Sequence, residues 1–184
     1  QGGGTGQELV FGVILGTGVG GGLIIHGRPV IGRGGLGGEW GHGPFIAHDE
    51  GASGIPCLPC QSGQSGCLDT IGGARGIERL HHHLSGKELH ARALLADWLA
   101  GDASARRTVD VWLDRMSAGL AMVANVTGAS IMPVGGGLAH QVDLIGALDI
   151  KVRSRILRQQ DTALVVPGCL PAESGLIGAS WLRD

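Results

Sequence analysis

Apolar residues along this chain recur in two patterns: short runs rich in Val, Leu and Ile, and longer stretches at helical spacing. The short runs predict strands, because β-branched residues pack well on a pleated sheet. A glycine-rich segment over residues 16–22 interrupts the first of them, which then resumes. The predicted strands cover residues 8–15, 23–26, 29–31, 131–134 and 163–166.

The longer stretches place apolar residues three or four positions apart, which predicts amphipathic helices. Residues 32–67 fit neither pattern and are expected to be irregular. Strands that alternate with helices are typical of an α/β sheet. The predicted helices cover residues 68–85, 87–100, 104–126, 142–157 and 173–182.

The amino-acid composition limits the kinds of partner that this protein is expected to bind. The chain has 14 basic and 16 acidic residues, a net charge of −2, so it lacks the basic surface of a nucleic-acid-binding protein. No run reaches the roughly 18 apolar residues of a membrane span. The first residues have neither the basic start nor the apolar middle of a signal peptide. We therefore expect a cytoplasmic protein of one domain, or one lobe of a larger protein, without a nucleic-acid or membrane partner.

One histidine and three cysteines lie within a short segment: His42, Cys57, Cys60 and Cys67. Thiolate and imidazole are the ligands that Zn²⁺ prefers, and four of them close a tetrahedral structural site. The four cysteines could instead form two disulfides. The clustering and the absence of a secretion signal favour zinc, while Cys169 stands apart.

Two glycine-rich segments are candidates for phosphate binding. Gly16, Thr17, Gly18 and Gly20 follow a predicted strand, and glycine N–H groups can surround a phosphate. The alternative is a hairpin turn without a ligand. Gly135, Gly136 and Gly137 follow another predicted strand and precede a helix, the position where α/β proteins bind nucleotides. The alternative there is a tight strand-to-helix turn.

Glu39 and His42 lie in the irregular region. Glu39 could accept hydrogen bonds from substrate hydroxyls, and His42 could bind metal through one ring nitrogen and donate from the other. The alternative is a pair of solvated surface residues. His81, His82 and His83 cannot converge on one ion from one face of a helix and are expected at a solvated helix end.

Taken in order, these motifs resemble the ROK family (repressor, open reading frame, kinase), and within it the bacterial N-acetylglucosamine kinases. The resemblance runs from Phe11 to Trp181, and its most specific parts are Glu39-Trp-Gly-His42 and the cysteine loop. It implies an actin-like ATPase (ribonuclease H-like) fold, of which this chain is the large lobe with a zinc-bearing loop. It also implies that the two glycine segments bind Mg-ATP, and that Glu39, His42 and Asp69 contact a sugar.

The chain departs from the family pattern in its cysteine loop, where Ser62 stands at the second cysteine position and Cys57 lies upstream. Asp69 stands where the family has a longer glutamate. The family's Asp-x-Gly-x-Thr phosphate motif and its Asn-Asp pair, which carries the catalytic base, do not occur. The resemblance therefore predicts that residues 1–184 are the C-terminal lobe of a kinase whose N-terminal lobe is absent from this chain.

The expected function of the complete protein is ATP-dependent phosphorylation of a hexose or N-acylhexosamine, N-acetylglucosamine above all, at its 6-hydroxyl. This chain contributes no catalytic base to that reaction and is expected to be inactive alone. A sugar-responsive ROK transcriptional repressor is the alternative, and a zinc-stabilised scaffold without a ligand is a third possibility. The resemblance also implies a homo-oligomer.

Overall fold

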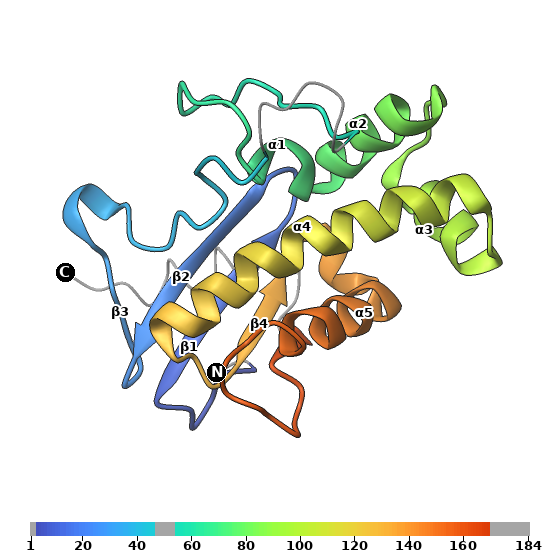
Figure 1. Cartoon of the computed structure of the whole chain (residues 1–184). Helices are drawn as coiled ribbons and strands as arrows, with labels where there is room; N and C mark the ends of the chain where they lie inside the picture. Colours follow the sequence, from blue (N-terminus) through green and yellow to red (C-terminus); the bar gives the residue numbers. More distant parts are fainter. Residues whose placement is uncertain (1–2, 47–53, 170–184) are drawn as a thin grey trace.

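The computed structural model describes residues 3–46 and 54–169 of the chain (Figure 1). They form a mixed sheet of five strands in the order β3-β2-β1-β4-β5. β1 pairs antiparallel with β2 and parallel with β4, and β4 pairs parallel with β5. The predicted α/β class is confirmed. The strands are β1 (Leu9–Leu15), β2 (Val19–Ile25), β3 (Arg28–Pro29), β4 (Met132–Gly135) and β5 (Val165–Pro167).

The second strand begins earlier than the sequence predicts. Gly20, Gly21 and Gly22 lie within β2, where they pair with residues of β1 in regular register. The prediction that the whole glycine segment interrupts the strand is therefore wrong. Strand pairing supplies backbone hydrogen bonds that offset the low strand propensity of glycine. The turn between β1 and β2 consequently shrinks to Gly16, Thr17 and Gly18.

Five α-helices and two short 3₁₀ helices are described. The predicted helix over residues 68–85 is two helices, since Gly73 adopts an extended conformation between them. A Cβ atom at Gly73 would collide with the carbonyl oxygen of Thr17, so the chain breaks where it passes the glycine turn. The helices are η1 (Arg33–Gly35), α1 (Asp69–Gly72), α2 (Ala74–Ser85), α3 (Ala91–Ala100), α4 (Ala103–Thr127), η2 (Gly137–His140) and α5 (Val142–Arg153).

Two other predicted helices are shorter in the structure. The prediction for residues 87–100 begins too early, because His90 is extended and the Glu78 carboxylate accepts the N–H of Ala91 at 2.8 Å. That contact caps the first turn of α3 from the neighbouring helix α2. The prediction for residues 142–157 ends too late, since α5 stops at Arg153. The predicted helix over residues 173–182 lies outside the described residues.

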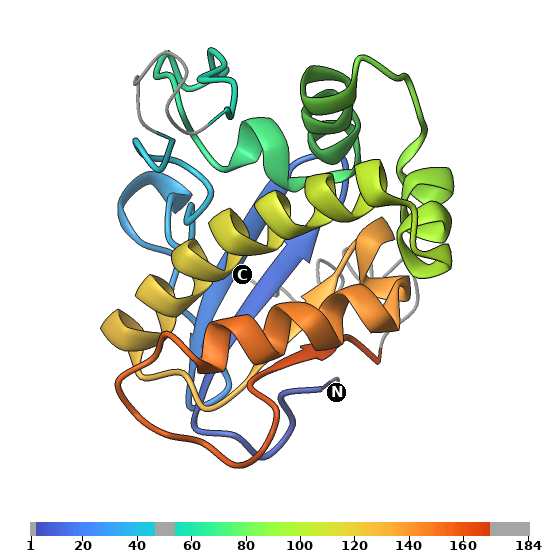
Figure 2. The ribbon, with the colours of Figure 1, turned by 45° about the vertical axis from the view of Figure 1, so that its right-hand side comes forward.

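Helices α4 and α5 cover one face of the sheet, as Figures 1 and 2 both show. The long helix α4 begins at Asp102, whose side chain accepts the N–H of Ala105 at 2.8 Å. Its apolar stripe, including Trp112, Met116 and Leu120, is fully buried. These side chains belong to the same core cluster as Phe11, Val13 and Leu15 of β1.

The opposite face of β1 carries the buried Val10, then Gly12 and the 47% exposed Ile14. Among residues 3–46 and 54–169, no helix is long and apolar enough to cross a membrane.

The order of the elements places the glycine turns at the carboxyl ends of β1 and β4, and the cysteine loop directly before α1.

Candidate functional site

The first glycine turn, Gly16 to Gly18, links β1 to β2 and is held from both sides. The Gly16 N–H donates to the Gly18 carbonyl at 3.0 Å. The Gly16 carbonyl accepts the N–H of Ala74, the first residue of α2, at 2.8 Å. Asp69, at the start of α1, accepts the N–H of Val19 at 2.8 Å through Oδ1. The turn is thus positioned by the two helices that follow the cysteine loop.

The second glycine segment lies directly beside the first. β1 and β4 are parallel, and Ile14 pairs with Gly135. Gly136 has a φ of +90°, and a Cβ atom there would come within 2.5 Å of the Leu15 carbonyl oxygen. Only glycine satisfies both the backbone conformation and this close approach. The sheet therefore brings together the two glycine segments that the sequence predicts as nucleotide-binding.

A compact group of metal-type ligands lies at His42, Cys60 and Cys67. One ligand atom from each lies within 4.8 Å of the other two. The Cys60 sulfur is 3.5 Å from the Nδ1 of His42. Cys60 and Cys67 are buried, and His42 is half-buried. Two thiols and an imidazole in this arrangement suit zinc, which binds both donor types in tetrahedral sites.

The surroundings of this group favour thiolates. Burial opposes ionisation of the Cys60 thiol, but hydrogen bonds with Ser62, Cys67 and His42 outweigh it and hold the pKa of Cys60 below its ordinary value of 9.0. The Gly43 N–H points at the Cys67 sulfur at 3.4 Å. Zinc requires deprotonated thiols, so both contacts suit a metal-binding role.

Cys57 is placed differently from the other two clustered cysteines. Its sulfur lies 3.7 Å from the carbonyl oxygen of Ile46, in hydrogen-bonding contact. It is not a member of the group formed by His42, Cys60 and Cys67. The structure therefore brings together three of the four predicted zinc ligands.

His42 connects the cysteine group to Glu39. Its Nε2 atom is 3.5 Å from Oε2 of Glu39, while its Nδ1 atom faces the Cys60 sulfur. The Glu39 side chain is 48% exposed, so it stays accessible to a ligand. A metal ligand whose second ring nitrogen meets a carboxylate is a common arrangement in metal sites, where it fixes the ring orientation.

The ROK family model matches residues 1–184 of the chain. The chain belongs to the ROK family. An N-acetyl-D-glucosamine kinase from Pectobacterium carotovorum subsp. carotovorum (strain PC1) is 38% identical over 151 residues, covering 81% of this chain and 50% of that protein. This ROK chain thus spans about half the length of that curated relative.

Solved ROK structures share the fold. A ROK hexokinase from Thermus thermophilus superposes with a TM-score of 0.79 at 29% identity, covering 97% of this chain and 58% of that one. A ROK glucokinase from Streptomyces griseus, in complex with glucose and AMPPNP, gives a TM-score of 0.77 at 25% identity, covering 96% and 60%. A ROK family transcriptional regulator, 21% identical over 85% of this chain and 40% of its own, shares the fold with a TM-score of 0.68. The actin-like fold of the ROK sugar kinases is therefore confirmed for this chain.

The third predicted sugar contact of this ROK chain, Asp69, is engaged with the glycine turn. Its Oδ1 atom accepts the Val19 N–H and lies 2.5 Å from the position that a Cβ atom of Gly18 would take. The structure therefore places Asp69 beside the predicted phosphate-binding segment. Its neighbours give it a positioning role that the sequence alone does not predict.

Trp40 is a buried core residue that also supports the candidate site, a role that the sequence does not reveal. Its indole N–H donates to the Gly20 carbonyl at 2.8 Å, and its side chain is buried. This contact fastens the segment that carries Glu39 and His42 to strand β2. The sequence shows only that a tryptophan lies between two polar candidates, and its partner is 20 residues away.

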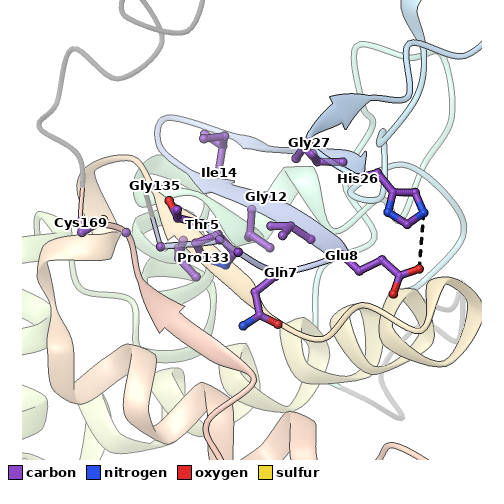
Figure 3. A pocket seen from close by; sticks show the side chains of 18 residues that line it. Thr5, Gln7, Glu8, Gly12, Ile14, His26, Gly27, Pro133, Gly135 and Cys169 are labelled. Carbon is purple, nitrogen blue, oxygen red and sulfur yellow. Dashed lines mark ion pairs between the residues drawn. The ribbon is translucent and has the colours of Figure 1, made fainter. Parts of the chain in front are cut away.

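Two cavities lie apart from the cysteine group. The larger, of about 920 Å³, borders the sheet face away from α4 and reaches Gly135, with Glu8 and His26 at its rim (Figure 3). The other, of about 670 Å³, lies beside His82, His83 and His90. Of the predicted site residues, only Gly135 lines either cavity.

His81 does not belong to a solvated helix end. It is buried on α2, and its Nδ1 lies 2.8 Å from the Thr108 hydroxyl of α4. The prediction for His81 is therefore wrong, whereas His82 and His83 are exposed as expected. Helical spacing from Ile77 places His81 on the apolar face of α2, and the Thr108 hydroxyl pairs with one of its two ring nitrogens.

Proposed function

We propose that this chain is the large lobe of an ATP-dependent sugar kinase that phosphorylates a hexose or N-acylhexosamine at its 6-hydroxyl, with N-acetylglucosamine as the leading substrate. The observation that carries the proposal is the meeting of two glycine segments at the carboxyl ends of β1 and β4. Nucleotides bind at that position in open α/β sheets. The curated relative's name and the glucokinase's bound AMPPNP support this choice.

In this proposal the groups of the site have distinct tasks, and His42 has two of them. Backbone N–H groups of Gly16 to Gly20 and the Thr17 hydroxyl bind phosphate oxygens, and Gly135 to Gly137 leave room for the adenosine. Glu39 and His42 accept or donate hydrogen bonds to sugar hydroxyls, and Asp69 steadies the glycine turn. Mg²⁺ bound with ATP would neutralise charge on the transferring phosphoryl group.

Zinc fits the donors at His42, Cys60 and Cys67 and would order the loop that carries Glu39. Its contribution is structural: metal binding free energy becomes folding free energy for an irregular segment. We expect the enzyme to work in the cytoplasm, where thiols stay reduced, and to form a homo-oligomer.

Phosphoryl transfer by the complete protein tests the proposal. Release of ADP is measured with N-acetylglucosamine, glucose and N-acetylmannosamine, and we expect the highest kcat/KM for N-acetylglucosamine. The alternative, a ROK transcriptional repressor, predicts sugar binding without ADP release and binding to operator DNA through helices outside this chain. If the complete protein binds sugar but releases no ADP with N-acetylglucosamine, glucose or N-acetylmannosamine, the proposed kinase function is rejected.

A further inference from the structure

Two distances around the cysteine group match the edges of a zinc tetrahedron. With zinc–sulfur bonds of about 2.3 Å and zinc–nitrogen or zinc–oxygen bonds of about 2.0–2.1 Å, each sulfur-to-nitrogen or sulfur-to-oxygen edge of a tetrahedron measures about 3.6 Å. The edge from Cys60 Sγ to His42 Nδ1 is 3.5 Å. The edge from Cys67 Sγ to the Ser62 hydroxyl is 3.8 Å. The Ser62 hydroxyl thus lies beside the three-ligand group, at a distance from the Cys67 sulfur that suits a shared metal ion.

Ser62 reaches both thiols because of the local turn. Cys60 and Gly63 close this turn, with the Gly63 N–H donating to the Cys60 carbonyl at 3.0 Å. The Cys60 N–H in turn donates to the Gln64 carbonyl at 2.7 Å. Within this turn Ser62 is hydrogen-bonded to Cys60 through both its side chain and its backbone. Its hydroxyl therefore lies within reach of both sulfurs at once.

Cys57 is held at a different place. Its sulfur contacts the Ile46 carbonyl and lies 3.3 Å from where a Cβ atom of Gly66 would be. Gly66 itself donates to the Leu58 carbonyl at 3.1 Å and accepts from Ile46 at 2.9 Å. Cys57 is thus engaged with Ile46 and Gly66, whereas the Ser62 hydroxyl already lies beside the Cys67 sulfur.

We propose that zinc in this chain is bound by His42, Cys60 and Cys67, with an oxygen donor at Ser62 in the fourth position instead of a third thiolate. The oxygen is the Ser62 hydroxyl or a water that it holds, since Ser62 is exposed to solvent. Two thiolates neutralise Zn²⁺, so the site carries no net charge. A neutral oxygen exchanges more readily than a thiolate, so the loop should lose zinc more easily than a site with four strong ligands.

X-ray absorption at the zinc edge of the zinc-loaded 184-residue chain tests the proposal without relying on kinase activity. We expect two sulfur ligands near 2.3 Å and two nitrogen or oxygen ligands near 2.0–2.1 Å. Cys57→Ala should leave this spectrum and the zinc content unchanged, as should the control Cys169→Ala. Three sulfur ligands in the parent chain, falling to two in Cys57→Ala, would overturn the proposal, as would failure of the parent chain to bind zinc.

A gain of a ligand is the complementary test. Ser62→Cys should raise the sulfur count from two to three and slow zinc transfer to a competing chelator by at least about tenfold, because a thiolate replaces a neutral oxygen. An unchanged sulfur count in a folded Ser62→Cys chain would show that position 62 does not face the metal. Circular dichroism establishes whether Ser62→Cys is folded. If it is not, the X-ray absorption spectra of the parent chain and of Cys57→Ala test the proposal.

Discussion

At the scale of single residues, the site depends on side chains that meet two partners at once. His42 faces a sulfur on one side and a carboxylate on the other. Asp69, at the start of α1, accepts the N–H of Val19 directly after the glycine turn. Such residues connect the cysteine loop to the predicted substrate-binding groups. A substitution at His42 or Asp69 should therefore disturb both parts of the site.

Glu39→Ala in the complete protein should impair sugar use far more than ATP binding. Hydrogen bonds from sugar hydroxyls to a carboxylate contribute about 1.5–3 kcal/mol each, which corresponds to roughly a tenfold to 150-fold loss of kcat/KM for the sugar. Steady-state kinetics with each substrate varied in turn measures the effect. Glu88→Ala, an exposed carboxylate beyond α2, is the control. Equal losses for sugar and ATP, with reduced zinc content, would point instead to collapse of the loop.

The stability of the chain should fall as the pH drops below about 6.5. Burial, together with the charge of Lys87, lowers the pKa of His81 from its ordinary value of 6.5. Below that value the unfolded chain takes up a proton that the folded chain does not. The free energy of unfolding then decreases, by at most about 1.4 kcal/mol per pH unit for one group, until the pH reaches the folded pKa.

Urea unfolding of His81→Asn against the parent between pH 7.5 and 5 measures this contribution. Asparagine can keep a hydrogen bond to Thr108 and does not titrate, so the pH slope should become shallower. His83→Asn, an exposed residue on the same helix, is the control and should retain the parent slope. Equal slopes for the parent and His81→Asn would show that His81 does not contribute.

At the scale of elements, contacts across the sheet set the geometry of the site. The turn after β1 and the segment after β4 touch through backbone atoms. Helix α5 is joined to β5 by the buried carboxylate of Asp149, which accepts the N–H groups of Leu164 and Val165 at 2.8 and 2.9 Å. Both contacts use atoms that are distant in sequence.

Gly136→Ala should separate the two glycine segments. The new Cβ atom would meet the Leu15 carbonyl oxygen, and a φ of +90° is strained for alanine. We expect a loss of more than about 1 kcal/mol of stability and a raised KM for ATP in the complete protein. Gly22→Ala, whose Cβ has open space, is the matched control. Unchanged nucleotide affinity in Gly136→Ala would exclude this contact from the ATP site.

Asp149→Ala should destabilise the chain by about 3–5 kcal/mol, because it leaves Arg153 and two buried N–H groups without their carboxylate partner. The free energy of unfolding from urea titration is the measurement. Asp143→Ala, exposed at the first turn of α5, should cost less than about 1 kcal/mol. Similar losses for the two variants would show that burial of Asp149 adds nothing.

At the scale of the whole molecule, this chain carries only part of the machinery that the ROK resemblance implies. It spans about half the length of its curated relative. Neither an Asp-x-Gly-x-Thr motif nor an Asn-Asp pair occurs in its 184 residues. Under the proposed kinase function, the glycine turns and the Glu39–His42 pair would act together with a catalytic base that the motifs of this chain do not supply.

The 184-residue chain by itself should not phosphorylate any sugar. General-base catalysis typically contributes 10²–10⁴-fold, and loss of part of the phosphate site adds to that. A coupled ADP assay with N-acetylglucosamine should give a rate equal to the background without sugar, while the complete protein provides the positive control. Turnover above background would mean that the base lies within this chain.

Local patterns in the sequence predicted the order of the strands and helices among residues 3–46 and 54–169, apart from the break at Gly73, and the buried stripe of α4. These properties depend on residue type and spacing along one element. Only the tertiary structure decided that Gly20 to Gly22 pair within β2, that the helix breaks at Gly73, and that His81 is buried. It also decided which cysteines meet His42. Whether two residues meet depends on how distant segments pack. Strand pairing and loop closure bring together residues whose spacing in the sequence does not predict their contact.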